Sequence, residues 1–251
     1  MLYLVTAIVT PVVLMLCAAT AQTSEAAKLA PVRTVLAKAI VPNTAGNPLY
    51  FKLLRVEMGP GQAVPAAESE GMLYILTGGP ISVITTERRT LVASGEALFL
   101  PGRSDATLEA AEHGTVTFLQ ILLGASADLD RVSYGAKATV TELYRTPASL
   151  AGLGVDALTF DVTRVTSPPH MPANPPHHRS GDALYFVLSG TGEFTTNGTV
   201  ASRPPGTPHF EPSGSVHQWA NPGDSPLILL VTNVTREGTP AIVSDALQPS
   251  K

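Results

Sequence analysis

The sequence contains little cysteine and little charge, and both shortages limit what the protein can be. Its single cysteine, Cys17, lies in the apolar N-terminal stretch, so a chain cut after Ala21 would carry no thiol. Such a chain can form no disulfide, no cysteine-ligated metal site and no cysteine nucleophile. Charged residues make up only 14% of the sequence and the formal net charge is -4, which provides no basic surface for a nucleic acid.

An uncharged apolar run, residues 2–19, is followed by the small-residue site Ala19-Thr20-Ala21. This arrangement is typical of a secretory signal peptide, with cleavage expected after Ala21 and a periplasmic or secreted location for the mature protein. Because no Lys or Arg precedes the run, an uncleaved N-terminal anchor is the alternative. After cleavage, no further membrane span is predicted.

Turn-forming residues are abundant, with 21 Gly and 22 Pro, and helix signals are few. Asn197-Gly198 lies between two β-prone runs and predicts a two-residue hairpin. Residues 226–235 are partly a continuous apolar run, which predicts a strand buried on both faces. Many short strands separated by Gly and Pro turns predict an all-β fold, as a sandwich or a jelly-roll barrel.

Two parts of the sequence repeat each other. LYILTGG (73–79) resembles LYFVLSG (184–190), and GEALFLP (95–101) resembles GTPHFEP (206–212), both at an offset of 111 residues. A shared offset at two separate places indicates two copies of one unit. The predicted organisation is a signal peptide at 1–21, an N-terminal barrel at 45–135, a linker at 136–150, a C-terminal barrel at 151–240 and a tail at 241–251.

The C-terminal copy contains the run GTPHFEPSGSVHQWAN. Its spacing of Gly206, Pro212, Gly214, His217 and Asn221 matches the second sequence motif of the cupin superfamily at every defining position. The sequence therefore resembles a two-domain cupin, or bicupin. This resemblance implies an all-β fold of two tandem cupin (jelly-roll β-barrel) domains.

In cupins the first motif supplies two histidines and a glutamate, and the second motif supplies one more histidine, to a divalent metal inside the barrel. The resemblance thus implies a bound divalent metal, and imidazole and carboxylate ligands suit Fe, Mn, Ni, Cu or Zn. His217 falls on the histidine of the second motif, and His178 on the second histidine of the first. Pro176 and Ala183 stand where the other histidine and the glutamate are expected.

Neighbouring residues are the candidate substitutes: His177 is next to Pro176, and Asp182 is next to Ala183. Because adjacent side chains of a regular strand face opposite ways, His177 and His178 can share a metal only where the chain is irregular. The candidate metal ligands are His177, His178 and His217, with Asp182, His170 and His209 as weaker candidates, and the expected pocket wall includes Tyr185, Phe210 and Trp219.

The N-terminal copy lacks these ligands, since the same offset places Ala67 and Ala106 opposite His178 and His217. Any metal or ligand site is therefore expected in the C-terminal barrel alone. The resemblance implies an exported bicupin that binds a divalent metal and a small organic ligand there, as a metal-dependent enzyme of dioxygenase type. The alternative is a non-enzymatic cupin that binds a small molecule or has a structural role. A homodimer is compatible with either, because exposed barrel edges often pair in this family.

Overall fold

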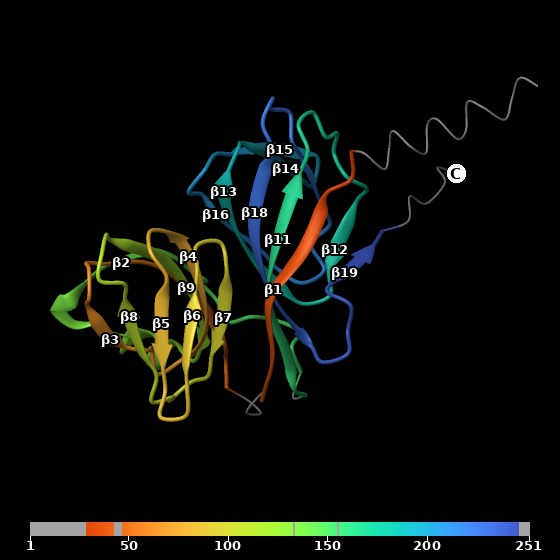
Figure 1. Ribbon diagram of the computed structural model, residues 1–251. Helices are drawn as coiled ribbons and strands as arrows, with labels where there is room; N and C mark the ends of the chain where they lie inside the picture. Colours follow the sequence, from red (N-terminus) through yellow and green to blue (C-terminus); the bar gives the residue numbers. More distant parts are fainter. Residues whose placement is uncertain (1–28, 43–46, 133, 155, 246–251) are drawn as a thin grey trace, which may run out of the picture.

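The computed structural model describes residues 29–42, 47–132, 134–154 and 156–245, and these residues form two neighbouring β-barrels (Figure 1). Apart from α2 (Ser126–Asp130) and the 3-10 turn η1 (Gly135–Lys137), the regular elements of this part of the chain are strands. The prediction of an all-β fold is confirmed. The predicted signal peptide falls on residues 1–21, which lie outside the described residues.

The N-terminal barrel consists of two antiparallel sheets. One has the strand order β10-β2-β9-β4-β7 and the other β3-β8-β5-β6. The strands are β2 (Tyr50–Met58), β3 (Ala63–Pro65), β4 (Glu70–Thr77), β5 (Ile81–Ile84), β6 (Arg89–Val92), β7 (Ala97–Leu100), β8 (Thr107–Ala110), β9 (Val116–Gly124) and β10 (Ala138–Arg145).

The C-terminal barrel has the same plan, with sheets of order β1-β11-β18-β13-β16 and β15-β14-β17-β12-β19. Its first strand comes from the other end of the chain, because β1 precedes the N-terminal barrel in sequence but pairs antiparallel with β11. The strands are β1 (Val32–Val41), β11 (Leu158–Ser167), β12 (His177–Arg179), β13 (Asp182–Ser189), β14 (Gly192–Thr196), β15 (Thr199–Arg203), β16 (Pro208–Glu211), β17 (His217–Ala220), β18 (Leu227–Arg236) and β19 (Ile242–Ser244).

Two of these strands lie in segments that the sequence suggests are a linker and a tail. Strand β10 lies within residues 136–150 and pairs with β2 of the N-terminal barrel. Strand β19 lies within residues 241–251 and pairs with β12. Both segments therefore contribute hydrogen-bonded edges to the barrels.

Local sequence signals account for several strands. The predicted hairpin joins β14 and β15, and its turn residues Asn197 and Gly198 have φ values of 49° and 73°, as a type I′ turn requires. The predicted apolar strand is β18, of which nearly every residue is buried. Both predictions are confirmed.

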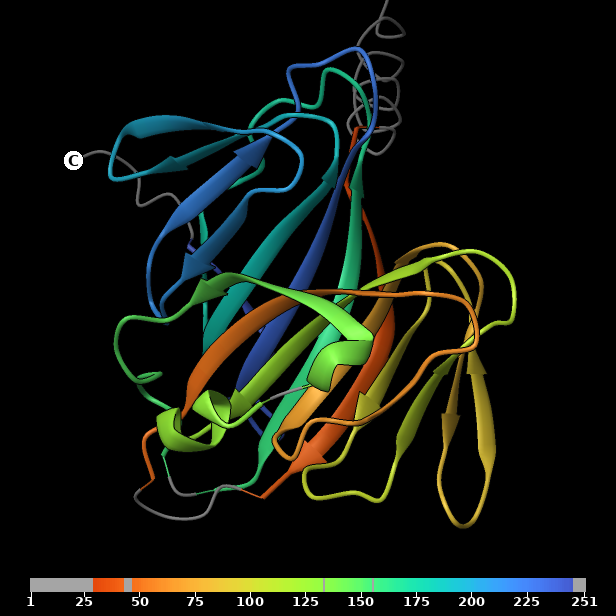
Figure 2. The ribbon, with the colours of Figure 1, turned by 90° about the vertical axis from the view of Figure 1, so that its left-hand side faces the viewer.

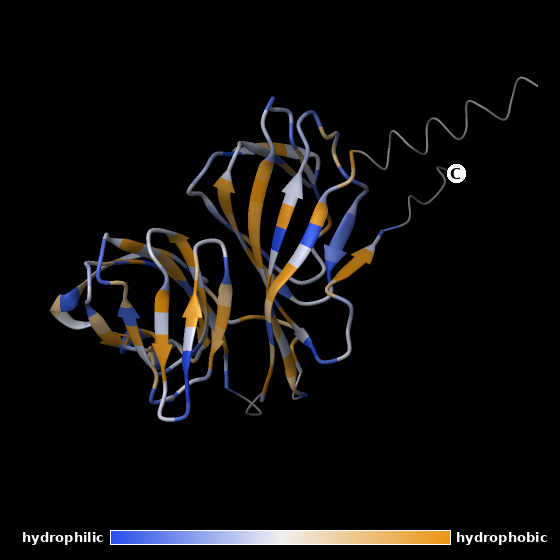
Figure 3. Ribbon diagram, in the orientation of Figure 1, coloured by the Kyte–Doolittle hydropathy of each residue, from blue (hydrophilic) through white to orange (hydrophobic). Residues whose placement is uncertain are grey.

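The sheet β10-β2-β9-β4-β7 of the N-terminal barrel packs against the sheet β1-β11-β18-β13-β16 of the C-terminal barrel, and these two large sheets join the barrels (Figures 1 and 2). Their contact contains the aromatic pair Phe51 and Phe160, with ring centroids 6.5 Å apart. Figure 3 shows apolar residues concentrated along these strands. One face of each sheet thus lines its own barrel, while the opposite face forms the contact with the other barrel.

Strands β4 and β13 correspond with an offset that differs by one residue from the repeat offset, because the register shifts lie at Ile75/Thr77 and Val187/Ser189. Gly78 and Gly190 both have positive φ, 95° and 75°, and a Cβ on either would lie close to the carbonyl oxygen of Thr115 or Pro226 respectively. The counterpart of Gly190 is therefore Gly78, and not Gly79 as the uniform offset suggests. The reason is geometrical, because only this register directs the same side chains of β4 and β13 into their barrels.

Candidate functional site

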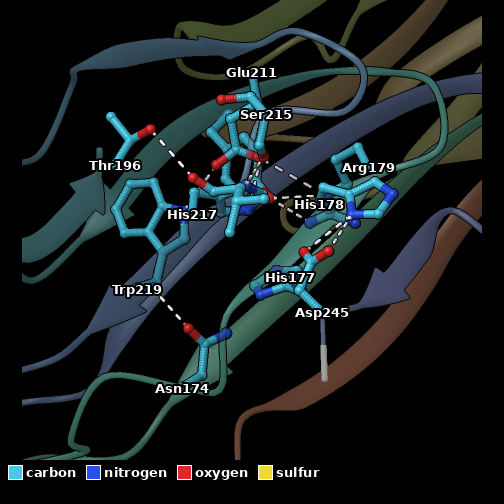
Figure 4. Close-up of polar contacts among 12 residues, drawn as sticks. Asn174, His177, His178, Arg179, Thr196, Glu211, Ser215, His217, Trp219 and Asp245 are labelled. Carbon is cyan, nitrogen blue, oxygen red and sulfur yellow. Dashed lines mark hydrogen bonds and ion pairs between the residues drawn. The ribbon is translucent and has the colours of Figure 1, made fainter. Parts of the chain in front are cut away.

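Strand β12 directs alternate side chains to opposite sides. His177 and Arg179 point into the C-terminal barrel and are 5% and 4% exposed. His178 lies on the outer side, where its Nδ1 is 2.9 Å from Oδ2 of Asp245 (Figure 4). The structure therefore brings His177 to the barrel interior with His217, and does not bring His178 to them.

His177 and His217 lie directly opposite each other on β12 and β17, with ring centroids 4.3 Å apart. The Nδ1 of His177 is 3.0 Å from the carbonyl oxygen of Pro175, and the Nδ1 of His217 is 2.9 Å from that of Ser215. Because a carbonyl oxygen only accepts hydrogen bonds, each Nδ1 carries a proton. The Nε2 atoms of both rings are thus left for other partners.

Glu211, on β16, is the buried acid beside these rings. Its Oε1 accepts a hydrogen bond from Nε1 of Trp219 at 3.0 Å. Its Oε2 lies 3.0 Å from Nε2 of His217 and 3.6 Å from Nε of Arg179. Burial raises the pKa of Glu211, but the contact with His217 and the positive charge of Arg179 outweigh it, so the pKa lies below its ordinary value. Glu211 is therefore an ionised carboxylate with a cationic partner.

Arg179 is held by Tyr185 as well as by Glu211. Its Nε donates to the Tyr185 hydroxyl at 3.0 Å, and its guanidinium carbon lies 5.3 Å from the centre of the Tyr185 ring. Tyr185 in turn stacks on Trp219, with centroids 5.4 Å apart. The cavity left beside these groups is about 10 Å³, which is room for one water molecule. The interior around Arg179 is thus closely packed.

Two imidazoles of this barrel are shifted towards their neutral form. Burial, together with the charge of His217, lowers the pKa of His177 to about 4. Burial also lowers the pKa of His209 to about 4, and the charge of Arg203 adds to this effect. Both rings are uncharged at neutral pH.

The remaining candidates from the sequence lie apart from the His177–His217 pair or have other roles. Asp182 accepts hydrogen bonds from the backbone N–H groups of Ala151 at 3.0 Å and Ser213 at 3.1 Å, so its carboxylate anchors two loops. His170 is an exposed turn residue whose Nε2 is 3.2 Å from Oδ1 of Asp224. Neither residue contacts His177 or His217.

His209 and the aromatic residues expected to line the pocket do not all face the interior of the C-terminal barrel. His209 packs against Phe194 in the barrel interior, with ring centroids 4.0 Å apart. Tyr185 and Trp219 lie in the same buried cluster as Phe194. Phe210 points to the opposite face, where its ring lies 6.5 Å from that of Tyr144, and it does not line the barrel interior.

The interior does not fit the metal site that the cupin resemblance implies. In the first cupin motif the two histidines are separated by one residue and both face the barrel interior. In this structure the two residues with that spacing and direction are His177 and Arg179, and not Pro176 and His178 as the sequence alignment predicts. A guanidinium thus occupies the place of the second histidine, and Ala183, fully buried, occupies the place of the glutamate. Within the described ranges, no three His, Cys, Asp or Glu side chains are arranged to hold a metal ion. A fixed positive charge beside His217 also opposes a divalent cation.

Sequence reasoning missed Arg179 and Glu211. Both were detectable, because each lies two residues from a histidine on the same strand, Arg179 from His177 and Glu211 from His209. Residues two apart on a strand face the same side. A histidine predicted to face the barrel therefore places the residue two positions away in the barrel too.

The polar interior belongs to one barrel only. Among the described residues, every buried acid and every buried imidazole comes from the C-terminal part of the chain: Asp161, His177, Asp182, Glu211 and His217. The described N-terminal barrel has an apolar core into which only a few uncharged polar groups and Lys52 extend. The described segments also contain no helix with the length and apolar character needed to cross a bilayer.

Comparisons with known proteins agree with this architecture. The family model described as Cupin domain matches residues 163–233, which contain β12 to β17 and so the whole polar cluster. No curated protein gives a match. The class that the fold defines is thus an all-β protein of two tandem jelly-roll barrels, of which the C-terminal one contains the match to the Cupin domain model.

Several solved structures share the fold at low sequence identity. A variant of Bacillus subtilis oxalate decarboxylase matches with a TM-score of 0.54 and 14% identity, over 82% of this chain and 74% of that chain. Salicylate 1,2-dioxygenase from Pseudaminobacter salicylatoxidans gives a TM-score of 0.51 and 10% identity, over 87% of this chain and 81% of that chain. AerE from Microcystis aeruginosa gives a TM-score of 0.54 and 8% identity, over 80% of this chain and 99% of that chain. At these identities the similarity establishes the fold alone.

Proposed function

We propose that the protein is an exported, metal-independent cupin whose C-terminal barrel binds a small organic molecule. The observation that carries this proposal is the position of Arg179. Its guanidinium lies where the family places a metal-ligating histidine, and it is paired with Glu211 at 3.6 Å. The cation inside this barrel is thus part of the chain.

The cost of burying such groups supports a functional role for this barrel. Removing a carboxylate, a guanidinium and two imidazoles from water costs several kcal/mol for each ion unless the groups are paired. The N-terminal barrel folds around an apolar core, so the jelly-roll fold itself does not require them. Clusters of buried ionisable groups with shifted pKa values are typical of functional sites.

A metal-dependent enzyme of dioxygenase type is the second candidate. It is favoured by the closeness of the His177 and His217 rings, whose centroids lie 4.3 Å apart, and by the 3.0 Å separation of the His217 Nε2 from the Glu211 Oε2. The Mn(II) centres named for Bacillus subtilis oxalate decarboxylase belong to a protein with the same fold. On this alternative, His177, Glu211 and His217 would have to move from the arrangement described above to hold a divalent metal such as Fe or Mn.

Metal content separates the two candidates. The mature protein is purified, reconstituted with Fe, Mn, Ni, Cu and Zn in turn, and measured by mass spectrometry for bound metal. We expect less than stoichiometric metal, unchanged in the His217→Ala variant. His113→Ala, an exposed site in the N-terminal barrel, is the control. One metal ion per chain, lost in His217→Ala but not in the control, would establish the second candidate instead.

A further inference from the structure

A pocket of about 450 Å³ opens on the outer side of the C-terminal barrel. It lies beside β15 and β16, which are the outermost strands of the two sheets of this barrel. The two sheets are not hydrogen-bonded to each other at these two edge strands. The residues used below are Tyr144, Asp182, Arg203, His209 and Phe210.

The pocket contains a cation without a carboxylate partner. Arg203 forms no ion pair with any described residue, its Nε is buried without a hydrogen-bond partner, and its guanidinium carbon lies 5.8 Å from the centre of the Phe194 ring. Asp182 is the acid of the pocket wall, but both of its oxygens already accept backbone N–H groups. The positive charge of Arg203 is therefore available to a ligand.

A second polar atom in the wall also lacks a partner. The Nε2 of His209 is buried and accepts or donates no hydrogen bond within the described chain. Buried polar atoms in folded proteins are nearly always paired, with protein, water or ligand. Arg203 and His209 both line the pocket, and a ligand carboxylate that reaches these two side chains would supply the hydrogen-bond partners that they lack.

The rest of the wall is aromatic. Tyr144, from the last strand of the N-terminal barrel, stacks on Phe210 with ring centroids 6.5 Å apart and an angle of 24° between the ring planes. Flat apolar surfaces of this kind favour flat apolar ligands. The pocket thus combines one cationic end with one aromatic wall.

We propose that this pocket binds a small carboxylate with a flat apolar body, its carboxylate on Arg203 and His209 and its body against Tyr144 and Phe210. This inference rests on the proposed function and assigns the ligand class and its position. The ligand lies outside the closely packed interior around Arg179, and His209, which packs on Phe194, connects the two regions.

The test is calorimetric titration of the full mature protein with three matched probes. Benzoate has the charge and the ring, benzamide has the ring without the charge, and cyclohexanecarboxylate has the charge without the flat ring. We expect benzoate to bind, and each of the other two to bind about tenfold more weakly, which corresponds to 1.4 kcal/mol. Equal binding of benzoate and benzamide, or no binding of benzoate at millimolar concentration, would overturn the proposal.

Variants locate the site. Arg203→Gln should weaken benzoate binding about tenfold and leave benzamide unchanged, because only the charged probe uses the guanidinium. Arg203→Lys retains the charge without the planar fork and should give an intermediate affinity. Arg88→Gln, at an exposed position of the N-terminal barrel, is the control. Thermal unfolding of each variant verifies that it is folded.

Two further measurements separate failure of this inference from failure of the proposed function. If benzoate binding survives in Arg203→Gln but is lost in Arg179→Met, the ligand occupies the barrel interior around Arg179. The outer pocket is then excluded as the binding site, and the proposed function stands. If binding depends on Arg203 but is lost when metal is removed with a chelator, the pocket stands and the metal-independent function is excluded.

Discussion

Arg179 shows how a single residue changes the chemistry of a fold. A histidine at this position would leave a neutral ligand for a metal, whereas arginine adds a permanent charge that needs a carboxylate nearby. Glu211 provides that carboxylate from β16. The two residues therefore depend on each other energetically.

This dependence predicts an asymmetric response to substitution. Glu211→Leu leaves the buried guanidinium without its partner, and we expect the free energy of unfolding to fall by about 3–5 kcal/mol. The double variant Arg179→Met, Glu211→Leu removes both charges and should be more stable than Glu211→Leu alone. Urea unfolding of the two variants measures the difference. The exposed pair Arg55–Glu57, with a separation of 2.7 Å, is the control, and Glu57→Gln should cost less than about 1 kcal/mol. Equal costs for the buried and exposed pairs would contradict the assignment.

The low pKa of His177 predicts a loss of stability in acid. Its pKa in the folded protein is about 4, below the ordinary value of 6.5, so the unfolded chain binds the proton first as the pH falls. The contribution of this ring to the free energy of unfolding is fully present above pH 6.5 and is lost as the pH falls to about 4. At 1.4 kcal/mol per pKa unit, the loss is on the order of 3 kcal/mol. The lowered pKa of Glu211 acts in the same direction.

Unfolding curves measured between pH 7 and pH 4 test this. His177→Gln should flatten the dependence on pH, because the group that titrates is removed. His113→Gln should leave it as in the unmodified protein, since His113 is exposed. An unchanged slope in His177→Gln would show that the ring is not held neutral.

At the scale of elements, strand alternation determined most of what could be predicted from the sequence. The hairpin at Asn197-Gly198 and the buried strand β18 follow from local composition. The cupin motif around His217 correctly indicated a histidine inside the barrel. What failed was the register of β12, because the spacing between the motif histidines and Gly190 allows either of two alignments. Only the hydrogen bonds of β12 with β17 and β19 decide that His177 and Arg179 face inwards.

The turn between β14 and β15 gives a prediction at this scale. Gly198 has φ of 73° and no atom within 4 Å of the place where a Cβ would stand, so Gly198→Ala meets backbone strain without a clash. We expect it to lower the free energy of unfolding by about 1 kcal/mol. Asn197→Gly, where φ is 49°, should change it by less than about 0.5 kcal/mol. A cost for Gly198→Ala no larger than for Asn197→Gly would contradict the turn geometry.

At the scale of the whole molecule, the two barrels differ in content although they share a plan. The face-to-face packing of their large sheets could not be predicted from the repeat, because a repeat does not specify how its copies associate. The exchange of β1 was equally hidden, since no local signal in residues 32–41 identifies β11 as the partner.

The export proposal concerns the complete chain. Expressed with its N-terminal segment in a bacterial host, the protein should be recovered outside the cytoplasm with Gln22 as its first residue, as measured by cell fractionation and intact-mass spectrometry. Ala21→Arg should block processing, because the cleavage site requires small residues. Recovery of the uncleaved chain in the membrane fraction would support the alternative of an N-terminal anchor.

The pairing of β1 with β11 has a consequence for the order of events during synthesis. Strand β1 leaves the ribosome first, yet its partner strand is made only after the entire N-terminal barrel, and Val32 pairs with Thr166. The first barrel can fold as it emerges, whereas the sheet β1-β11-β18-β13-β16, which contributes Glu211 to the polar cluster, cannot form in full until β18 has been made. Contacts of such long sequence separation form slowly. The C-terminal barrel is therefore completed after the N-terminal barrel, and the edge of β1 that pairs with β11 remains exposed until β11 has been made.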